Sequence, residues 1–212
     1  MRTPPYRIET ERVVIRCYDP ADAPLLKECV DSSLPELQAR MPWALDDPQS
    51  VAEKVELLRG MRSRFDADTD YALGVFTLDG SRQLGGTGLH RRGTPDSLEI
   101  GYFVRTDSIG RGLATHVVGT LTDVGLRHCR ARRIQIDVEA DNSASLAIPR
   151  KLGYLEEGVL RGRAAWPDQE PRDIVTFSLL ATEYPIVAGE RSPAGRPAGL
   201  AYRAYDAAGR QL

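Results

Sequence analysis

The sequence predicts an α/β (α+β) fold, and three observations lead to this prediction. Segments in which apolar and polar residues alternate, as in strands, occur along most of the chain. Segments with apolar residues at every third or fourth position, as in amphipathic helices, lie between them. In the middle of the chain a strand over 98–104, a glycine-containing turn at 108–112, a helix over 113–129 and a strand over 133–139 form a βαβ-like unit.

Helix and turn signals divide the first half of the chain. Asp19 before Pro20 is a helix-start signal, because proline is favoured in the first turn of a helix. Asp79-Gly80 is a hairpin-type turn. In order, we predict a strand over 12–18, a helix from Pro20 to about residue 30, a loop at 41–44, a helix from Pro48 or Ser50 to about residue 65, and strands over 71–78 and 83–90.

The period of the apolar residues changes in the second half. Leu113, Val117, Leu121 and Val124 recur at helical spacing, and Gly153 stands where a helix is expected to end. We predict strands over 98–104 and 133–139, helices over about 111–129 and 143–152, and strands over 154–159 and 174–180 around a turn at 166–168.

The last 27 residues differ from the rest. Gly, Pro, Ala and Arg dominate 186–212, and the apolar periodicity disappears. We predict a single domain over 1–185 and a mobile tail over 186–212, with a docked or partner-binding extension as the alternative.

Composition and charge exclude several classes of protein. The 212 residues, 42% hydrophobic and 27% charged, suffice for one domain with a substantial core. A net charge of −2 gives no reason to expect nucleic acid or an anionic membrane as a partner. Neither a membrane span of roughly 18 apolar residues nor a secretory signal is visible.

The cysteines indicate neither a disulfide framework nor a metal site. Cys17, Cys29 and Cys129 are scattered and form no CxxC or Cys/His cluster. An odd, scattered set fits a reducing compartment, so we predict a cytoplasmic protein without a metal.

The turn before the predicted helix over 113–129 has the features of an anion site. Gly110 and Gly112 permit positive φ and a close approach of backbone to ligand. Successive N–H groups at a helix N-terminus bind anions, and Arg111 adds positive charge. A P-loop is excluded because no Gly-Lys-Ser/Thr follows, and a dinucleotide fingerprint because position 115 is Thr115 rather than glycine. A pyrophosphate fits this turn.

Seven stretches between about residues 8 and 184 have the order and spacing of one known family. They are ETERVVIR (9–16), MPW (41–43), LGGTGLH (84–90), LEIGY (98–102), GRGLAT (110–115), DNSAS (141–145) and KLGYLEEGVLR (151–161). Together they resemble the GCN5-related N-acetyltransferase (GNAT) superfamily, in the branch of the ribosomal-protein N-terminal acetyltransferases. The resemblance implies a mixed, strongly bent sheet with helices on both faces, in which two parallel strands, about 98–104 and 133–139, splay apart.

The resemblance also implies acetyl-CoA as the donor and assigns residues to it. Pantetheine would pair with backbone beyond Tyr102, at Phe103 and Val104, and Asn142 would contact its bent part. Ser145 would donate a hydrogen bond toward the thiolate, or merely cap the helix. The pyrophosphate would lie on the amides of Ser108, Ile109, Gly110, Arg111, Gly112, Leu113 and Ala114.

Two positions depart from the family pattern. Asp107 stands where the family usually has Gln or Arg at the start of the phosphate loop, so we expect its side chain to point away from the phosphates. Pro149 stands where many members have a tyrosine, which removes a tyrosine acid and should kink the helix or shift its start.

Acyl transfer from a thioester to an amine needs a neutral amine, a stabilised oxyanion and protonation of the leaving thiolate. A peptide N-terminus has a pKa of about 8, so a modest base suffices. Glu99 is the leading base candidate, against an ordinary salt-bridge role, and Asp137 is the second, with Glu139 on the same face. A backbone N–H near Tyr102 or Phe103 would meet the oxyanion.

Several further side chains are placed by the pattern or the resemblance. Tyr154 is expected in the core, and His116 and His128 at the surface or an interface. The arginines at the end of the long helix are expected to be solvated or to bind the cofactor's adenosine phosphate; they are Arg127, Arg130, Arg132 and Arg133. The acceptor site is expected to be shaped by Met41, Trp43, His90, Trp166 and Asp173.

The sequence therefore predicts an acetyl-CoA-dependent N-acetyltransferase acting on a primary amine, foremost a protein or peptide N-terminus. Two alternatives stay open. One is acetylation of a small-molecule amine such as an antibiotic, a polyamine or an amino acid derivative, and the other is a non-catalytic acyl-CoA-binding module. The expected partners are the acyl-CoA donor and the amine acceptor, without nucleic acid or membrane, and a homodimer is a hypothesis from the resemblance.

Overall fold

The computed structural model describes residues 1–167, 170–184 and 201–212. The contacts between its residues define two compact units. Unit 1 comprises Met1–Pro4, His90–Gly101 and Thr115–Leu200, and unit 2 comprises Pro5–Leu89, Tyr102–Ala114 and Ala201–Leu212. The chain passes from one unit to the other within a strand, β5 (Ser97–Val104), and within a helix, α4 (Leu113–Asp123).

The strands of unit 2 are antiparallel neighbours in the order β4-β3-β2-β1-β9. A tight turn joins β1 to β2, with the Thr10 amide donating to the Val13 carbonyl at 3.0 Å. The C-terminal strand pairs with the N-terminal one, with Ile8 opposite Ala204. The bounds are β1 (Arg7–Thr10), β2 (Val14–Cys17), β3 (Tyr71–Phe76), β4 (Gln83–His90) and β9 (Tyr202–Tyr205).

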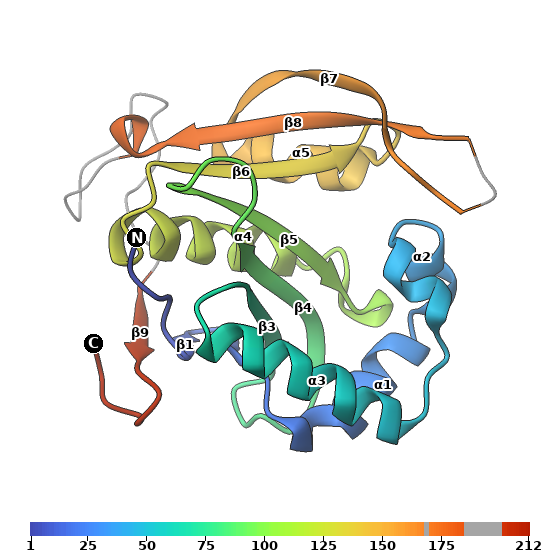
Figure 1. Ribbon diagram of the computed structural model, residues 1–212, viewed down its shortest axis with the longest axis vertical. Helices are drawn as coiled ribbons and strands as arrows, with labels where there is room; N and C mark the ends of the chain where they lie inside the picture. The colour runs from blue at the N-terminus through green and yellow to red at the C-terminus, as the bar shows by residue number, and fades with distance from the viewer. Residues whose placement is uncertain (168–169, 185–200) are drawn as a thin grey trace. The chain divides into compact units, whose positions relative to one another are not determined.

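Capping residues define where the helices of unit 2 begin. Asp19 and Ser50 each form a capping box, which satisfies backbone N–H groups that the first turn leaves unpaired. Two of these helices, α1 and α3, pack side by side, and α3 covers β3 (Figure 1). The helical segments are η1 (Pro20–Asp22), α1 (Ala23–Asp31), α2 (Leu34–Gln38), η2 (Pro42–Asp46), α3 (Val51–Asp66) and η3 (Thr106–Ser108).

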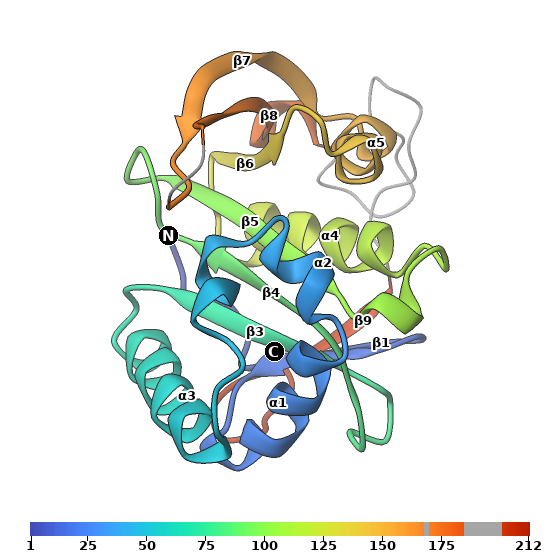
Figure 2. The ribbon, with the colours of Figure 1, turned by 90° about the vertical axis from the view of Figure 1, so that its right-hand side faces the viewer.

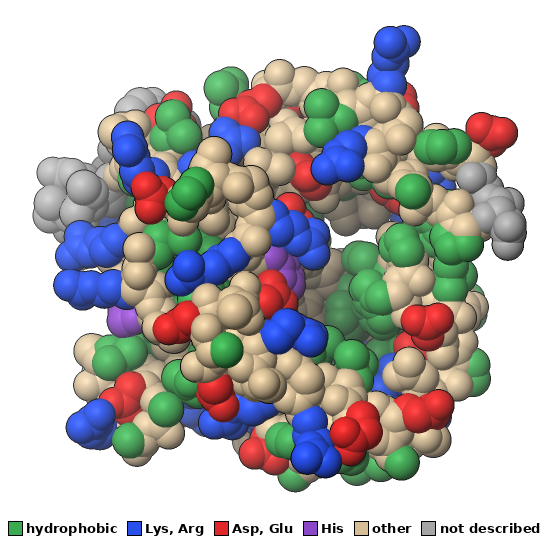
Figure 3. All heavy atoms as spheres, in the orientation of Figure 1, with side chains coloured by type: hydrophobic (Ala, Val, Ile, Leu, Met, Phe, Trp, Pro, Cys, Tyr) green, Lys and Arg blue, Asp and Glu red, His purple; other side chains and the backbone are tan. Residues whose placement is uncertain are grey.

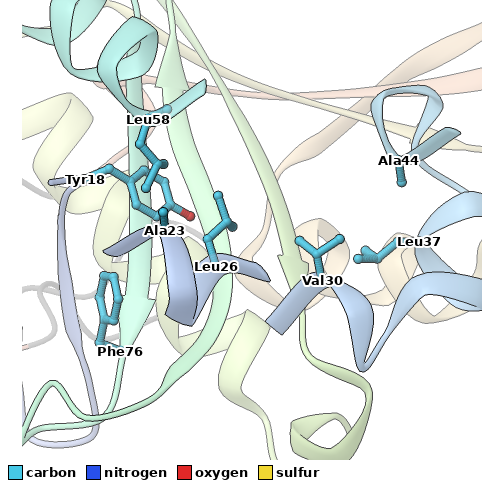
Figure 4. Close-up of a cluster of buried hydrophobic side chains, with 9 residues drawn as sticks. Tyr18, Ala23, Leu26, Val30, Leu37, Ala44, Leu58 and Phe76 are labelled. Carbon is cyan, nitrogen blue, oxygen red and sulfur yellow. The ribbon is translucent and has the colours of Figure 1, made fainter. Parts of the chain in front are cut away.

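A cluster of buried apolar side chains joins these helices to the sheet. Tyr18 and Phe76 come from the sheet side, Leu26 from α1 and Leu58 from α3 (Figure 4). Val30, Leu37 and Ala44 extend the cluster to the segment that carries the predicted loop at 41–44. Burial of this apolar surface is the main stabilising contribution in unit 2.

Unit 1 is built on the strand order β7-β8-β6-β5. Helix α5 packs against β6 and β7 (Figure 2) and ends at Gly153, whose φ of 75° is the left-handed conformation of a helix C-cap. The remaining bounds are η4, a π-helical turn (Val124–His128), β6 (Arg133–Glu139), α5 (Ser143–Leu152), β7 (Leu155–Ala164), β8 (Arg172–Leu180) and η5 (Ala181–Glu183).

The parallel pair of strands separates within unit 1. Ser97, Leu98 and Glu99 of β5 pair in parallel with 133–135 of β6, and this pairing ends at Glu99 opposite Gln135. Strand β6 continues through Glu139 paired with β8 on its other side. Two parallel strands that part after three residues are what the predicted splay requires.

The structure confirms the α/β (α+β) fold class. It adds β1, α2 and β9, which we did not predict, and it lengthens the strand predicted over 154–159 to Leu155–Ala164. Residues 186–200 of the predicted tail lie outside the described residues. The end of the tail takes the alternative, docked form, because β9 pairs with β1 along four residues.

Basic and acidic side chains are interspersed on the molecular face shown in Figure 3. This distribution agrees with the net charge of −2.

Candidate active site

Glu99 lies in unit 1 at the last paired position of β5 before the strands part. Its side chain is 15% exposed, and Oε1 accepts a hydrogen bond of 2.7 Å from Nη1 of Arg92. Arg92 follows the end of β4 and is itself mostly exposed. The strand therefore presents a largely buried carboxylate that is paired with the exposed guanidinium of a long side chain.

Burial and three neighbouring groups set the protonation of this carboxylate. Burial raises the pKa of Glu99 above its ordinary value, and the charge of Asp137 raises it further. Arg92 and His90 oppose these effects and lower the pKa, but the net direction is upward. A carboxylate with a raised pKa is a better proton acceptor than an exposed one.

Three predicted residues are thus brought together in unit 1: Glu99, Asp137 and His90. Asp137 lies on β6 two residues beyond the last paired position, and its carboxylate accepts hydrogen bonds of 3.1 Å from Gln135 Nε2. His90 ends β4 with its ring beside Gly101, where a Cβ would lie 3.4 Å from Nε2. Residues 99 and 101 share one face of β5, so the imidazole and the Glu99 carboxylate lie on the same side of the strand.

The start of α5 holds the two residues predicted to contact pantetheine and its sulfur. Asn142 is the N-cap, and its Oδ1 accepts the amide of Ser145 at 3.1 Å. Asn142 therefore caps α5 through its side chain, and the role of the Ser145 hydroxyl stays a prediction. Helix α5 begins at Ser143 as expected and includes Pro149, so the proline does not shift its start.

Glu139 and Trp166, both buried, form a cluster with the partly exposed Arg172 in unit 1. Trp166 Nε1 donates to Glu139 Oε1 at 2.9 Å, and Arg172 pairs with the same carboxylate at 3.0 Å while lying 4.1 Å from the indole centroid. Trp166 is only 5% exposed, so packing in the protein interior is a sufficient reason for a tryptophan at this position. The acceptor-site role of Trp166 stays a prediction, and Glu139 is occupied by two donors, which weighs against it as a base.

Asp173, the other acceptor residue predicted near the last hairpin, has a structural partner. Its Oδ1 accepts the Gly162 amide at 2.7 Å, and its carbonyl accepts the Ala140 amide at 2.9 Å. These bonds tie β7 and the end of β6 to β8. The carboxylate retains a second oxygen, so its role toward an acceptor stays a prediction.

The predicted phosphate loop lies in unit 2. Gly110 and Gly112 have φ values of 75° and 71°, which side chains with a Cβ rarely adopt. Among the described residues, no backbone carbonyl accepts the amides of Gly110, Arg111 or Gly112. Exposed amides in a turn at a helix N-terminus fit a diphosphate.

Asp107, at the start of that loop, is held by other side chains of unit 2, and its orientation away from the phosphates stays a prediction. Its carboxylate binds Arg82, accepts Arg105 Nε at 3.1 Å and accepts Ser108 Oγ at 2.9 Å. Arg105 also pairs with Glu28 of α1 at 2.9 Å. Burial acts to raise the pKa of Asp107, but the hydrogen bond from Ser108, followed by Arg105 and Arg82, holds it below its usual value. The ion pairs of these arginines also connect the start of the loop to the rest of unit 2.

The backbone of β5 in unit 2 is packed against glycines of β4. A Cβ on Gly85 would lie 2.2 Å from the Phe103 carbonyl oxygen, and one on Gly86 would lie 2.5 Å from the Phe103 ring. The LGGTGLH stretch therefore allows the close approach of Tyr102–Val104, the segment predicted to pair with pantetheine.

The predicted acceptor loop of unit 2 also reaches Phe103. The Trp43 ring lies 5.5 Å from the Phe103 ring, and Trp43 remains 43% exposed. Met41 packs partly buried against the apolar cluster. The loop is a 3₁₀ turn, η2, rather than irregular.

Sequence reasoning missed Arg92 and Arg12, whose partners become visible only in three dimensions. It was wrong on His116, which is buried. Tyr154 is in the core as expected, with its hydroxyl 2.6 Å from Thr122 Oγ1. Arg127 and Arg133 form ion pairs with Asp123 and Glu157.

Two features are absent from the described part of the chain. Its His, Cys, Asp and Glu side chains form no group able to hold a metal ion. In residues 1–167, 170–184 and 201–212, no helix combines the length and apolar character needed to cross a membrane.

The chain is similar to known acetyltransferases. The model of a family described as acetyltransferase (GNAT) domain matches residues 12–155. A Bacillus subtilis protein, YdaF, named provisionally as a ribosomal N-acetyltransferase, is 26% identical over 175 residues, which are 82% of this chain and 94% of YdaF.

Solved structures agree with this similarity. A crystal structure assigned provisionally as an acetyltransferase superposes with a TM-score of 0.75 at 26% identity, over 82% of this chain and 96% of its own. Mycobacterium smegmatis RimJ, solved in complex with CoA-disulfide, superposes with a TM-score of 0.77 at 22% identity, over 87% and 92%. The likeness to RimJ concerns the fold.

Proposed function

Because the chain belongs to the acetyltransferase (GNAT) domain family, we propose that it moves an acetyl group from acetyl-CoA to the N-terminal amine of a protein or peptide. The observation that carries the proposal is Glu99, a buried carboxylate of raised pKa at the point where β5 and β6 part. The raised pKa suits a group that must accept a proton from an amine.

The amine class follows from the strength of the base. A peptide N-terminus has a pKa of about 8 and a lysine side chain one of about 10.4, so the first is far more often neutral near pH 7. A single carboxylate whose pKa is raised by burial and by Asp137 suits the N-terminal amine. The similarity to YdaF, whose name refers to ribosomal N-acetylation, supports the same class of acceptor.

The residues of unit 1 carry the proton transfers in this proposal. Glu99 accepts the proton of the acceptor amine. Asp137 keeps the pKa of Glu99 raised, while Arg92 limits the shift. Ser145, in the first turn of α5, donates a hydrogen bond toward the departing sulfur.

The residues of unit 2 hold the donor. Acetyl-CoA supplies the acetyl group in activated form, as a thioester. The exposed amides of Gly110, Arg111 and Gly112 fit its diphosphate, and the backbone of Tyr102–Val104 fits its pantetheine arm. A backbone N–H near Tyr102 or Phe103 donates to the negative charge that develops on the carbonyl oxygen.

The test is an acceptor screen with purified full-length protein, reading the release of free thiol from acetyl-CoA across N-terminal peptides and small amines. We expect turnover of peptides, reduced by roughly 10²–10⁴-fold in Glu99→Gln. Glu156→Gln is the matched control, because Glu156 is exposed and, among the residues that the structure describes, its side chain pairs with Arg150 alone.

Three results would contradict the proposal in different ways. Turnover of small amines alone would refute the peptide acceptor. Binding of acetyl-CoA without turnover of any amine would favour the non-catalytic module. Full activity of Glu99→Gln would remove Glu99 from the proton transfer.

A further inference from the structure

Arg12 lies in the turn between β1 and β2 and reaches the phosphate loop of the same unit, 99 residues further along the chain. Its Nη2 donates a hydrogen bond of 2.8 Å to the carbonyl oxygen of Arg111. Its Nη1 lies 3.9 Å from the point where a Cβ of Gly112 would stand. The guanidinium therefore rests on the Arg111–Gly112 peptide, at the centre of the loop.

We propose that Arg12 is a positioning residue for the diphosphate of the donor, because it fixes the orientation of the Arg111–Gly112 peptide. The inference rests on the proposed function, since it assumes that the loop binds CoA. Arg12 itself touches the loop from outside and is not assigned a contact with the donor.

Peptide geometry gives the first reason. In a trans peptide the C=O and the N–H point in opposite directions, and the only cis peptide among the described residues is Asp47-Pro48. When Arg12 holds the Arg111 carbonyl, the Gly112 N–H must point away from the guanidinium. That amide is one of the exposed donors of the loop, so Arg12 keeps it directed outward for an anion.

Mobility gives the second reason. Gly110 and Gly112 both have positive φ, and a loop with two glycines gains more conformational entropy when free than other loops do. Without an anchor, the peptide between them is free to rotate and to turn its carbonyl toward the phosphates. A hydrogen bond from a charged donor opposes that rotation and strengthens the N–H of the same peptide by polarisation.

The backbone of Arg12 is itself fixed. The hydroxyl of Thr10 accepts the amides of Arg12 at 3.2 Å and Val13 at 3.0 Å. Thr10 is 8% exposed, and β1 pairs with β2 on one side and β9 on the other. Because the turn is already fixed, binding to the loop costs Arg12 the conformational entropy of its side chain but no further backbone entropy.

The experiment measures the Kd of CoA and of 3′-dephospho-CoA by calorimetry for the wild type and variants of the full chain. We expect Arg12→Gln to weaken both ligands roughly tenfold, because both contain the diphosphate. Arg12→Lys, which keeps one donor, should recover part of the loss. Arg59→Gln is the control, since it removes the same charge from an exposed pair on α3 and should leave both Kd values unchanged.

Turnover provides a second readout that a loss of structure would not produce. With acetyl-CoA varied, Arg12→Gln should raise KM and leave kcat at saturation unchanged, and its thermal unfolding should match that of the wild type.

Four results separate the possibilities. An unchanged Kd in Arg12→Gln overturns the inference. A loss of affinity in Arg59→Gln as large as that in Arg12→Gln also overturns it. A loss seen with CoA but not with 3′-dephospho-CoA would place Arg12 on the 3′-phosphate instead and also overturns it. If the wild type binds neither ligand, the proposed function fails before the role of Arg12 is tested.

Discussion

Glu99 combines two properties that rarely coexist in a surface carboxylate. It is largely buried, which favours the neutral form, yet it keeps a cationic partner, Arg92, which favours the charged form. The first effect is the larger, and the like charge of Asp137 adds to it. The protonation of Glu99 is therefore set by its neighbours, and each neighbour can be removed separately.

Removing these neighbours should move the pKa of Glu99 in opposite directions. Asp137→Asn deletes a like charge that raises the pKa, so the pKa should fall. Arg92→Gln deletes the cation that lowers it, so the pKa should rise. A ¹³C NMR titration of the side-chain carboxyl, assigned with Glu99→Gln, measures both shifts, and the base form should persist to lower pH in Asp137→Asn.

The direction of each shift is the decisive result. If both substitutions moved the pKa of Glu99 the same way, the two charges would not act on it separately, and the grouping of Glu99, Asp137 and Arg92 would be wrong. Asp141→Asn is a suitable control, because Asp141 is an exposed carboxylate of the same unit and is not among the main causes of the pKa shift of Glu99.

At the scale of elements, η2 and α3 are joined by an ion pair without access to solvent. Lys54 Nζ lies 2.6 Å from Asp47 Oδ1, and both side chains are 1% exposed. Gln38 of α2 donates to the carbonyls of Ala44 and Asp47 in the same loop. The segment that presents Trp43 is thus held by buried polar contacts as well as by the apolar cluster.

Breaking this pair on one side should be costly. Lys54→Met leaves the Asp47 carboxylate buried without its cation, and we expect a loss of about 3–5 kcal/mol in the free energy of unfolding. Urea unfolding at neutral pH measures it. The double variant Lys54→Met/Asp47→Asn, which also removes the anion, should be less destabilised than the single one.

The matched control is again at the surface of the same helix. Arg59 pairs with Glu56, and both side chains are about two-thirds exposed. Arg59→Met should therefore change stability by less than about 1 kcal/mol. Equal effects of Lys54→Met and Arg59→Met would show that the buried pair does not stabilise the loop.

At the scale of the whole molecule, local sequence patterns were sufficient to predict a helix or strand where that element is long or has strong capping signals. The helices after Asp19 and Ser50 and the helix ending at Gly153 were predictable, because each signal acts on its own neighbours. Strand β1 and helix α2 are only four and five residues long, too short for a periodicity. Strand β9 lies in a segment rich in Gly, Pro and Ala, and its pairing depends on β1 at the other end of the chain.

The residues of the candidate site also fall into those that could be predicted from local sequence and those that could not. Glu99, Gly110 and Gly112 could be proposed from the sequence because their residue types and positions in a motif suit the chemistry. The partners Arg92 and Arg12 could not, since a surface arginine has no sequence signature that distinguishes a partner in the fold from solvent. Tertiary structure alone supplies that information.

The docking of β9 leads to a prediction about the entire chain. Deleting 201–212 removes the strand that pairs with β1 and leaves the N–H and C=O groups of Arg7–Thr10 unpaired along one edge. It also exposes the surface against which the buried Ala204 packs. An unprotected edge strand favours association between copies. We expect the truncated protein to unfold several degrees lower in calorimetry, at roughly 2–4 °C for each kcal/mol lost, and to form oligomers in size-exclusion chromatography with light scattering.

Tyr205→Phe is the control for this deletion, because it removes only the 3.1 Å bond from the Tyr205 hydroxyl to Glu9 and leaves the strand pairing intact. It should change the unfolding temperature little and leave the oligomeric state as in the wild type. A truncated protein with unchanged unfolding temperature and mass would show that β9 does not stabilise the sheet. Since β9 contributes no group to the Glu99 cluster, loss of the strand should reduce stability more than it reduces kcat.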